Sequence, residues 1–478
     1  MKYPFLICGL ILAIIGCSCS GRNSDPVEKK NQADSLAVSL QKFDDKIAKG
    51  EVVPVLKCRY DSSLSYALYL PKKYSVNDKL PVILFFDSHG SGVLPVGKYK
   101  ELAEQYGYIL AGSNNSKNGL GWEQNEPQIK TFMADVRSKI NVDGRRVYAC
   151  GFSGGSRVAS SVAIFDGGIA GVIGMGAGFP SISEPIHNKF DYIGFAGNED
   201  FNMNEMAELD SSMNRSPLRH QLIIFNGKHE WAPADVAENA FVWCEVNAMK
   251  DGFISKNDSL LKNFLTKSTE EMKKLSDKKR AFNEYLLCKK MVNMLEGLAD
   301  VSQFKKRADE LRKSAELKIE IEKKQKLAKE EMIQQENYRN NIVLKDLTWW
   351  KSEIQKMRVQ TNYHSDEERA MMTKRVLNYL SLAVYMNVTS AIQSRQTEQA
   401  ASLLELYTLV DPENSEHQYL FAELYAGKKE NAKALASLKN AVRLGFNDLA
   451  RMQSDSALAV LKNSPDYKKL IEQLESKK

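Results

Sequence analysis

The sequence predicts an α/β domain with a doubly wound sheet, followed by an all-α helical region that ends in repeats. Short apolar runs alternate with amphipathic stretches between about residues 50 and 251, as strands and helices do in an α/β sheet. Glycine and proline are also unevenly placed: proline is absent from Ala234 to Asp411, and glycine from Leu298 to Ala426. Because these residues mark tight turns, the first half suits a sheet and the second half suits long helices.

Composition limits the classes of protein that the chain can represent. Its 478 residues are too many for one ordinary core, so several domains are expected. A content of 43% hydrophobic and 26% charged residues excludes wholesale disorder and a polytopic membrane protein. The net charge of +6, from 66 basic and 60 acidic residues, is too weak over this length to indicate a nucleic-acid partner. No CxxC pair and no HExxH motif occur, so no metal site is expected.

The N-terminus has the features of a secretory signal peptide. A positive start precedes the apolar run Pro4–Ile15, which is shorter than the roughly 20 residues of a membrane-spanning helix. The run ends in Ile14-Ile15-Gly16-Cys17, which resembles a bacterial lipobox. The resemblance implies cleavage before Cys17 and lipidation of that residue. A plain signal peptide cut near Ser20 or Gly21 is the alternative.

The lipobox resemblance implies a lipoprotein of the bacterial cell envelope, held to a membrane through lipidated Cys17. Serine rather than an acidic residue at position 18 favours the outer membrane by analogy. Five segments are then expected: a lipoprotein signal peptide in residues 1–16, a polar tether in 17–45, the α/β domain in 46–250, a helical linker domain with a long charged helix in 251–375, and a repeat region in 376–478.

Seven apolar runs are predicted as strands, with four amphipathic stretches as helices between them. The strands are Ser65–Leu70, Pro81–Phe86, Tyr108–Gly112, Arg146–Cys150, Ala170–Gly174, Tyr192–Ala196 and Gln221–Phe225. The helices are Tyr99–Tyr106, Pro127–Ile140, Ser156–Ile164 and Ala234–Val246. This order is the one expected of a parallel, doubly wound sheet with short crossovers.

The strand Arg146–Cys150 runs directly into the sequence GFSGG at residues 151–155, a GxSxG match. The string alone is weak, but its place between a strand and a helix of small residues is that of a nucleophile elbow. Ser153 would lie on a sharp, strained turn, and side chains at Gly151 and Gly155 would collide as strand and helix approach. Ser153 is therefore the candidate nucleophile, and the Gly154 N–H is a candidate oxyanion donor. A glycine-rich turn without catalysis is the alternative.

Two loops after later strands carry the expected partners, in the order serine, acid, histidine. Asp200 follows the strand Tyr192–Ala196, and His229 follows the strand Gln221–Phe225; the carboxyl ends of such strands meet at one edge of the sheet. His229 would take the serine proton and return it to the leaving group, while Asp200 would hold the histidine tautomer. Glu199 is the rival acid. A surface-loop histidine and an Asx-turn aspartate are the alternatives without catalysis.

A second oxyanion donor is expected in the turn Asp87–Gly92, which follows the strand Pro81–Phe86. The turn resembles the HG-type oxyanion turn of esterases. We expect the backbone N–H groups of Gly90 and Ser91 to be the donors, with the His89 side chain packing the turn. An independent acid–base pair of Asp87 and His89 is the alternative.

Residues Tyr66–Trp243 resemble the α/β-hydrolase superfamily, nearest its polyhydroxybutyrate-depolymerase and feruloyl or acetyl esterase branch. The matching pieces are YALYLPKKY, LPVILFFDSHGSG, LAEQYGYILAGSNNSKNG, VDGRRVYACGFSGGSRVA, AGNEDFN and NGKHEWAP. The resemblance implies a serine enzyme that hydrolyses esters without a metal or organic cofactor. The short stretch 180–190 leaves no room for a large lid, so an open cleft is expected. Trp122 and Trp231 are candidates to line that cleft, with simple packing as the alternative.

The second half is predicted as successive helices. Apolar residues at steps of three and four in Phe304–Asn341 predict one long amphipathic helix with a solvated charged face. Its apolar stripe, which includes Ile319, lasts only about two heptads and is too short for a coiled coil, so it is expected to pack against a neighbouring helix. Trp349 and Trp350 are expected to anchor the next helix in a core.

A weak self-similarity with a 34-residue step lies near the end of the chain. Ala400 and Leu404 recur as Ala434 and Leu438. The two units, about Ser381–Asn447, resemble tetratricopeptide repeats, which implies a groove for a protein partner; a structural cap for the α/β domain is the alternative. Two units are fewer than the three that a free-standing solenoid needs, so the preceding helices are expected to complete the stack.

These observations favour a lipid-anchored, secreted serine hydrolase, most simply a carboxylic-ester hydrolase that forms an acyl-enzyme on small or polysaccharide-linked esters. One alternative is a non-catalytic tetratricopeptide scaffold with a hydrolase-like binding domain. A serine peptidase is a second alternative, because the same triad attacks amides. The complete set of Ser153, Asp200 and His229 favours an enzyme over the scaffold.

Overall fold

The structure is a computed structural model that describes residues 43–182, 185–362 and 366–476. Residues 43–478 form one unit, so the sheet and the helices of the second half are described together. The predicted signal peptide, the lipidation site Cys17 and nearly all of the tether lie outside the described residues. No helix in the described ranges is both long enough and apolar enough to cross a membrane.

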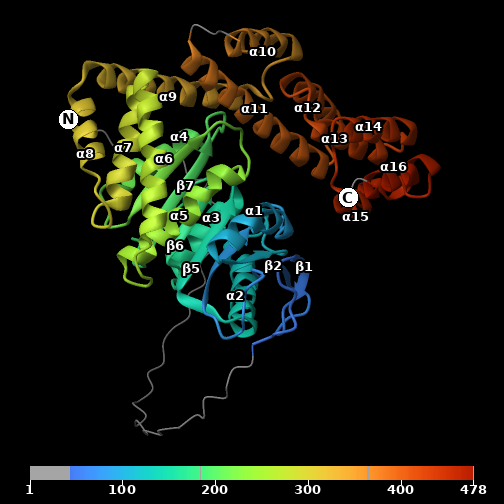
Figure 1. The fold of residues 1–478 in the computed structure, drawn as a ribbon. Coiled ribbons are helices and arrows are strands. Elements are labelled where there is room, and N and C mark those ends of the chain that lie inside the picture. Colours follow the sequence, from blue (N-terminus) through green and yellow to red (C-terminus); the bar gives the residue numbers. More distant parts are fainter. Residues whose placement is uncertain (1–42, 183–184, 363–365, 477–478) are drawn as a thin grey trace, which may run out of the picture. The chain divides into compact units, whose positions relative to one another are not determined.

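The first half folds around a sheet that has eight strands in the described residues, in the order β1-β2-β4-β3-β5-β6-β7-β8 (Figure 1). The strands are β1 (Val52–Lys57), β2 (Ser65–Tyr69), β3 (Leu80–Phe86), β4 (Ile109–Ser113), β5 (Val142–Phe152), β6 (Gly171–Met175), β7 (Asp191–Gly197) and β8 (His220–Phe225). Neighbours from β4 to β8 are parallel, as predicted. The prediction of a wholly parallel sheet is wrong at one edge, where β1 pairs antiparallel with β2, and β2 with β4.

Sequence patterns did not indicate β1. This edge strand contains Pro54 and leaves the Val55 side chain exposed. Proline is tolerated in an edge strand because one row of N–H groups has no partner there, and partial exposure weakens the apolar pattern that marks a strand. The opposite edge of the sheet is formed by β7 and β8, the strands that lead to the predicted acid and histidine loops.

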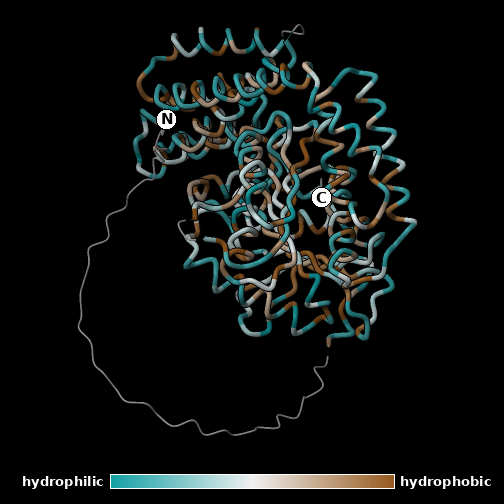
Figure 2. Tube along the Cα trace, turned by 90° about the vertical axis from the view of Figure 1, so that its left-hand side faces the viewer, coloured by the Kyte–Doolittle hydropathy of each residue, from teal (hydrophilic) through white to brown (hydrophobic). Residues whose placement is uncertain are grey.

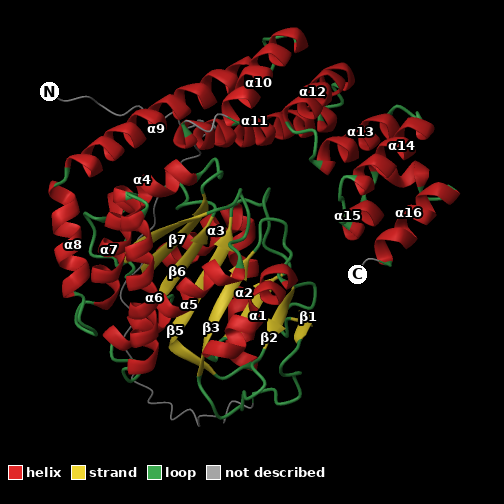
Figure 3. Ribbon diagram, turned by 45° about the horizontal axis from the view of Figure 1, so that its top comes forward, coloured by secondary structure: helices red, strands yellow, loops and turns green. Residues whose placement is uncertain are grey.

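Helices cover both faces of the sheet (Figure 3). One face carries α1 (Val93–Tyr106) and α5 (Ala234–Lys250), and the other carries α2 (Trp122–Lys139), α3 (Gly154–Ser161) and α4 (Met203–Met213). Phe85 belongs to the first core and Phe86 to the second, because successive residues of a strand point to opposite faces. The continuous apolar run of β3 is thus explained by burial on both sides.

The second half is helical, as predicted, and hydrophilic residues prevail on its outer turns (Figure 2). The helices are α6 (Asp258–Asp277), α7 (Ala281–Leu295), α8 (Ser302–Lys313), α9 (Ala315–Asn341), α10 (Leu347–Thr361), α11 (Glu367–Gln393), α12 (Thr397–Val410), α13 (Ser415–Gly427), α14 (Asn431–Arg443), α15 (Leu449–Ser454) and α16 (Pro465–Glu475). Leu261, Met291 and Phe304 from α6 to α8 are buried in the same core as α1 and α5. The predicted boundary after residue 250 therefore falls between helices that share one core.

The single long helix predicted over Phe304–Asn341 is wrong, because the structure divides it at Ser314. This residue has an extended backbone, with ψ 148°, and its side chain accepts a hydrogen bond from the Leu317 N–H at 3.1 Å. It thereby caps the N-terminus of α9, as serine often does. The break also turns the apolar stripe: Ile319 is 65% exposed, whereas Leu317 is buried.

The 34-residue step seen in the sequence is also the spacing of the helices. Helices α11 and α13 end at Gln393 and Gly427, while α12 and α14 begin at Thr397 and Asn431. Four side chains at matching positions of the two units are fully buried: Ala400, Leu404, Ala434 and Leu438. The two units therefore pack alike, and their assignment as tetratricopeptide repeats stays a prediction.

Candidate active site

The candidate nucleophile lies where β5 ends and α3 begins. Ser153 has φ 54° and ψ −120°, a backbone conformation that side-chain-bearing residues rarely adopt. Its N–H donates to the Met175 carbonyl oxygen of β6 at 2.8 Å, which ties the turn to the neighbouring strand. Such strain persists only where the surroundings hold it, and it is common at functional sites.

Two glycines beside Ser153 are required by close backbone contacts. A Cβ atom on Gly151 would lie 2.0 Å from the Gly155 carbonyl oxygen, and one on Gly155 would lie 1.9 Å from the Phe86 carbonyl oxygen. Both distances are far inside van der Waals contact. The collisions expected from the sequence at Gly151 and Gly155 are thus confirmed. Because neither residue has a side chain, strand β5 and helix α3 can approach this closely.

The structure brings the three predicted triad side chains together. His229 Nε2 lies 3.0 Å from Ser153 Oγ, and His229 Nδ1 lies 2.9 and 3.0 Å from the two carboxylate oxygens of Asp200. Asp200 is fully buried. A carboxylate only accepts, so Nδ1–H donates to Asp200, and Nε2 is left to accept the serine O–H. This arrangement can activate a hydroxyl group for nucleophilic attack.

The imidazole of His229 is held by its neighbours as well as by Asp200. Its ring centroid lies 4.7 Å from that of Phe152 and 4.3 Å from that of Phe201. Gly176 has φ +67°, and a Cβ atom there would lie 2.8 Å from the Phe152 ring and 3.1 Å from the His229 ring. No sequence pattern marked Phe201 or Gly176, because their adjacency to the site arises only from the pairing of β6, β7 and β8.

The rival acid, Glu199, makes a different contact. Its carboxylate accepts from Lys374 Nζ of α11 at 2.8 Å, while the Asp200 carboxylate accepts from His229 and from the Asn202 N–H at 2.8 Å. Asp200 is thus the acid that contacts His229. The contact between Glu199 and α11 has no signal in local sequence, because the two residues are 175 positions apart.

The predicted second oxyanion donors are already engaged. The Gly90 N–H donates to the Asp87 carbonyl oxygen at 3.1 Å, and the Ser91 N–H donates to Asp87 Oδ1 at 3.2 Å. The expectation that these two N–H groups bind an oxyanion is therefore wrong in this structure, because the Asp87 carbonyl oxygen accepts from the first and the Asp87 carboxylate from the second. His89 does not pack the turn either, since its side chain is 87% exposed.

Two other groups lie near the elbow and are candidates for oxyanion donors. Gly154 opens helix α3, so its N–H has no acceptor within the helix. The side chain of Asn118 lies directly against it: a Cβ atom on Gly154 would lie 1.8 Å from Asn118 Oδ1 and 3.1 Å from Asn118 Nδ2. Asn118 was not predicted as a site residue, although it lies within one of the pieces that resemble the α/β-hydrolases.

The two tryptophans proposed for the cleft are packing residues in the structure. Trp231 is 7% exposed, its Nε1–H donates to Asp87 Oδ2 at 3.2 Å, and its ring packs against Phe152. Trp122 packs against Phe165 with ring centroids 5.7 Å apart, on the face of the sheet that carries α2, α3 and α4. Trp231 therefore stabilises the Asp87 turn, and its expected role as a cleft-lining residue is wrong. The same hydrogen bond argues against Asp87 as an acid–base group.

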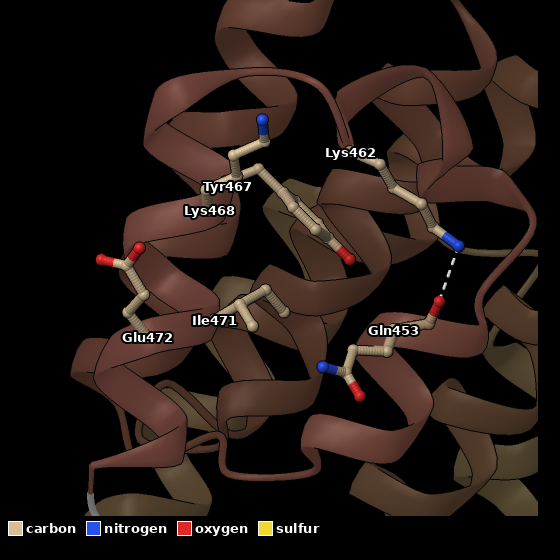
Figure 4. A pocket seen from close by; sticks show the side chains of 6 residues that line it. All are labelled: Gln453, Lys462, Tyr467, Lys468, Ile471 and Glu472. Atoms are coloured by element: carbon tan, nitrogen blue, oxygen red, sulfur yellow. Dashed lines mark hydrogen bonds between the residues drawn. The ribbon is translucent and has the colours of Figure 1, made fainter.

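A hollow of about 330 Å³ lies elsewhere, in the last helical segment of the described chain. Its lining includes Gln453, Tyr467 and Ile471, and Lys462 Nζ donates to the Gln453 carbonyl oxygen at 2.6 Å (Figure 4). None of the candidate triad residues lines it. The hollow offers no nucleophile–base pair, so it is not a second candidate for the chemistry of Ser153.

Comparison with known proteins gives structural neighbours only. No family model matches the chain, and no curated protein matches it. An S-formylglutathione hydrolase from Staphylococcus aureus is 12% identical, with a TM-score of 0.32 over 38% of this chain and 90% of that one. Esterase 2 of the Planctomycetes species Thermogutta terrifontis, bound to butyrate, is 15% identical, with a TM-score of 0.32 over 43% and 96%. A ferulic acid esterase is 17% identical, with a TM-score of 0.33 over 41% and 95%.

These neighbours are named as a hydrolase and two esterases, and each match covers less than half of this chain. The described structure itself has a mainly parallel sheet region with helices on both faces and a large helical C-terminal part. At such identities and TM-scores the likeness says nothing about substrate, and the chemistry of the site rests on its own geometry.

Proposed function

We propose that the chain is a serine hydrolase that cleaves carboxylic esters through an acyl-enzyme. Ser153 is the nucleophile, His229 the general base and Asp200 the residue that orients the histidine. The observation that carries the proposal is the continuous hydrogen-bonded chain from Ser153 Oγ through His229 to Asp200, on a strained turn at a strand-to-helix junction.

The chemistry follows from the direction of each hydrogen bond. His229 Nε2 accepts the Ser153 proton as Oγ attacks the ester carbonyl, and Asp200 stabilises the imidazolium that forms. The negative oxygen of the tetrahedral intermediate is stabilised by the Gly154 N–H, with Asn118 Nδ2 as the proposed second donor. Imidazolium then protonates the departing alcohol, and a water molecule, deprotonated by the same histidine, hydrolyses the acyl-enzyme.

The proposed substrate is a small soluble ester or an ester attached to a polysaccharide. The described residues between Phe179 and β7 contain no helix or strand, which supports an open site without a structured lid. The sequence resembles the feruloyl and acetyl esterase branch, which supports an ester of this kind. A serine peptidase remains the alternative, because the same triad attacks amides.

An active-site fluorophosphonate probe tests the proposal directly. We expect the wild-type chain to be labelled on Ser153 and Ser153→Ala to remain unlabelled, because the probe needs an activated serine. A panel of p-nitrophenyl acetate, butyrate and feruloyl esters beside aminoacyl anilides then compares the two reaction classes. Absence of labelling in the wild type would favour the non-catalytic scaffold, and faster anilide than ester cleavage would favour the peptidase.

We also propose that the enzyme is a lipoprotein of the bacterial cell envelope, held to the outer membrane through Cys17. The support is the sequence Ile14-Ile15-Gly16-Cys17 after an apolar run, with serine at position 18. Metabolic labelling with palmitate is expected to mark the wild-type chain and to be lost in Cys17→Ala. Equal labelling of the two chains would contradict this site.

The repeat region, residues 376–478, is the proposed protein-binding arm of the enzyme. The equal spacing and equal burial of its helices support tetratricopeptide-like units, and Met386 of α11 leaves an apolar side chain 59% exposed there. In-cell cross-linking from a photoreactive residue at position 386 tests the idea, and a surface that cross-links to no protein would count against it.

A further inference from the structure

The loop that carries the candidate acid is held from outside the α/β domain. Three side chains of α11 contact the two residues that precede the acid. Lys374 Nζ donates to Glu199 Oε1 at 2.8 Å, Arg375 Nη1 donates to the Asn198 carbonyl oxygen at 2.9 Å, and Asn378 Nδ2 donates to the Glu199 carbonyl oxygen at 2.8 Å. Position 378 lies three residues after 375 and four after 374, so its side chain neighbours both of the others on the surface of the helix.

Arg375 is itself held rigidly by α9. Its Nε and Nη2 atoms donate to the Glu331 carboxylate at 2.9 and 2.6 Å, and the two side chains are 8% and 1% exposed. A two-point charged hydrogen bond of this kind determines orientation as well as distance. Breaking a buried pair leaves an uncompensated charge, so α9 and α11 present the guanidinium to the loop in one arrangement.

The backbone of the loop forms hydrogen bonds in two directions, its N–H groups to the histidine loop and its carbonyl groups to α11. The Asn198 N–H donates to the Phe225 carbonyl oxygen at 2.8 Å, and the Glu199 N–H donates to the Gly227 carbonyl oxygen at 3.0 Å. These bonds tie the loop to the segment that leads to His229. The two carbonyl groups of the same residues accept from α11, so the peptide groups before the acid are bonded on both sides.

We propose that α11 is a positioning element of the triad: Lys374, Arg375 and Asn378 hold the loop so that Asp200 meets His229. The inference rests on the proposed function of Ser153 and adds to it a role for the helical half of the chain. None of the three residues touches the reacting atoms, so each acts through the loop. The helices of the second half thereby become part of the machinery that sets the geometry of the triad.

Lys374 also has an electrostatic role, because it neutralises a second carboxylate beside the acid. The charged groups packed around this loop are Lys374 and Arg375 of α11, Glu331 of α9, Glu199 and Asp200 of the loop itself, and Lys228 and Glu230 beside His229. Removing the lysine charge leaves Glu199 unpaired. An unpaired negative charge close to a base of this kind favours its positively charged form over the neutral one. Because the base must be neutral, activity would then appear only at higher pH.

The test uses the full chain with three variants and one matched control. Asn378→Ala removes one loop contact, Lys374→Met removes the charge, and Lys374→Met combined with Glu199→Gln removes the lysine and the carboxylate that it neutralises. Arg369→Gln is the control, since Arg369 joins α11 to Glu330 of α9 without contacting the loop. The measurements are kcat and KM for p-nitrophenyl acetate across pH, the rate of fluorophosphonate labelling, and thermal unfolding.

We expect Asn378→Ala to lower kcat about 5- to 30-fold with KM within twofold, because a small displacement of a catalytic group costs rate. Lys374→Met is expected to move the acid limb of the kcat/KM profile upward by about 0.5 pH unit, and the added Glu199→Gln to move it back. Arg369→Gln should stay within twofold of the wild type. If Asn378→Ala does not fold, the test rests on Lys374→Met and on its combination with Glu199→Gln, since Lys374 is partly exposed and its replacement is less disruptive.

Three different failures can be distinguished. A wild-type chain that hydrolyses the ester, with variants that keep both its kcat and its acid limb, would overturn the role of α11 and leave the proposed function intact. A wild-type chain that neither hydrolyses esters nor reacts with the probe would overturn the proposed function itself. A shift of the acid limb that the added Glu199→Gln does not reverse would contradict the electrostatic role of Lys374.

Discussion

Replacing His229 with glutamine is expected to lower kcat for ester hydrolysis at least about a thousandfold. Glutamine keeps much of the volume of the side chain but cannot accept the Ser153 proton and return it to the leaving alcohol. The ring fills the space between Phe152 and Phe201, so the substitution is a chemical change inside a preserved pocket. Steady-state kinetics with p-nitrophenyl butyrate measures the loss, and unchanged thermal unfolding would show that the fold is intact.

His220 provides a matched control for that experiment. Its Nδ1 atom lies 2.8 Å from Asp210 Oδ1, so it forms a histidine–aspartate pair like that of His229, but the pair joins β8 to α4 without a serine. His220→Gln should therefore leave kcat within about twofold, because its pair contributes structure rather than proton transfer. A loss below about tenfold in His229→Gln would show that a different base serves Ser153.

The substitution Gly155→Ala is expected to abolish activity because it displaces helix α3 from the sheet. The added Cβ atom would lie 1.9 Å from the Phe86 carbonyl oxygen, so α3 must move away from β3 and carry Ser153 out of line with His229. Forced movement in a packed core costs about 1–3 kcal/mol or more. Urea unfolding is expected to show that loss of stability, and the fluorophosphonate probe is expected to show slow labelling or none.

Gly97 of α1 is the control for Gly155. A Cβ atom on Gly97 would meet no atom within 4 Å, and alanine is a better helix former than glycine by about 0.5–1 kcal/mol. Gly97→Ala should therefore be as stable as the wild type or slightly more stable, with unchanged labelling. Equal stability of the two variants would contradict the close contact at Gly155.

The parts of the site that the sequence predicted are those specified by neighbouring residues. The elbow at Ser153 is specified by five consecutive residues between a strand and a helix. Gly151 and Gly155 are required there because any side chain would collide with nearby backbone. Asp200 and His229 each follow a buried strand, and parallel strands end at one edge. The order of the strands was enough to bring these three residues together.

The parts that the sequence did not predict depend on side-chain orientation or on distant contacts. The Asp87 carboxylate accepts from the Ser91 N–H, one of the groups expected to bind an oxyanion, and no residue pattern reveals which way that side chain folds. The contact of α11 with the acid loop joins residues about 175 positions apart. The break at Ser314 was hidden because a stripe of apolar residues continued across it, while the cap is a single hydroxyl group.

The core shared by α5, α6, α7 and α8 has a consequence for how the protein can be divided. A fragment that ends at Lys250 would lack Leu261, Met291 and Phe304, which pack against α1 and α5. The apolar surface exposed by their loss favours aggregation. The helices α6 to α8 should therefore melt together with the sheet in one cooperative transition. The smallest fragment expected to fold on its own, whether expressed alone or fused to another protein, therefore extends beyond the sheet to at least the end of α8.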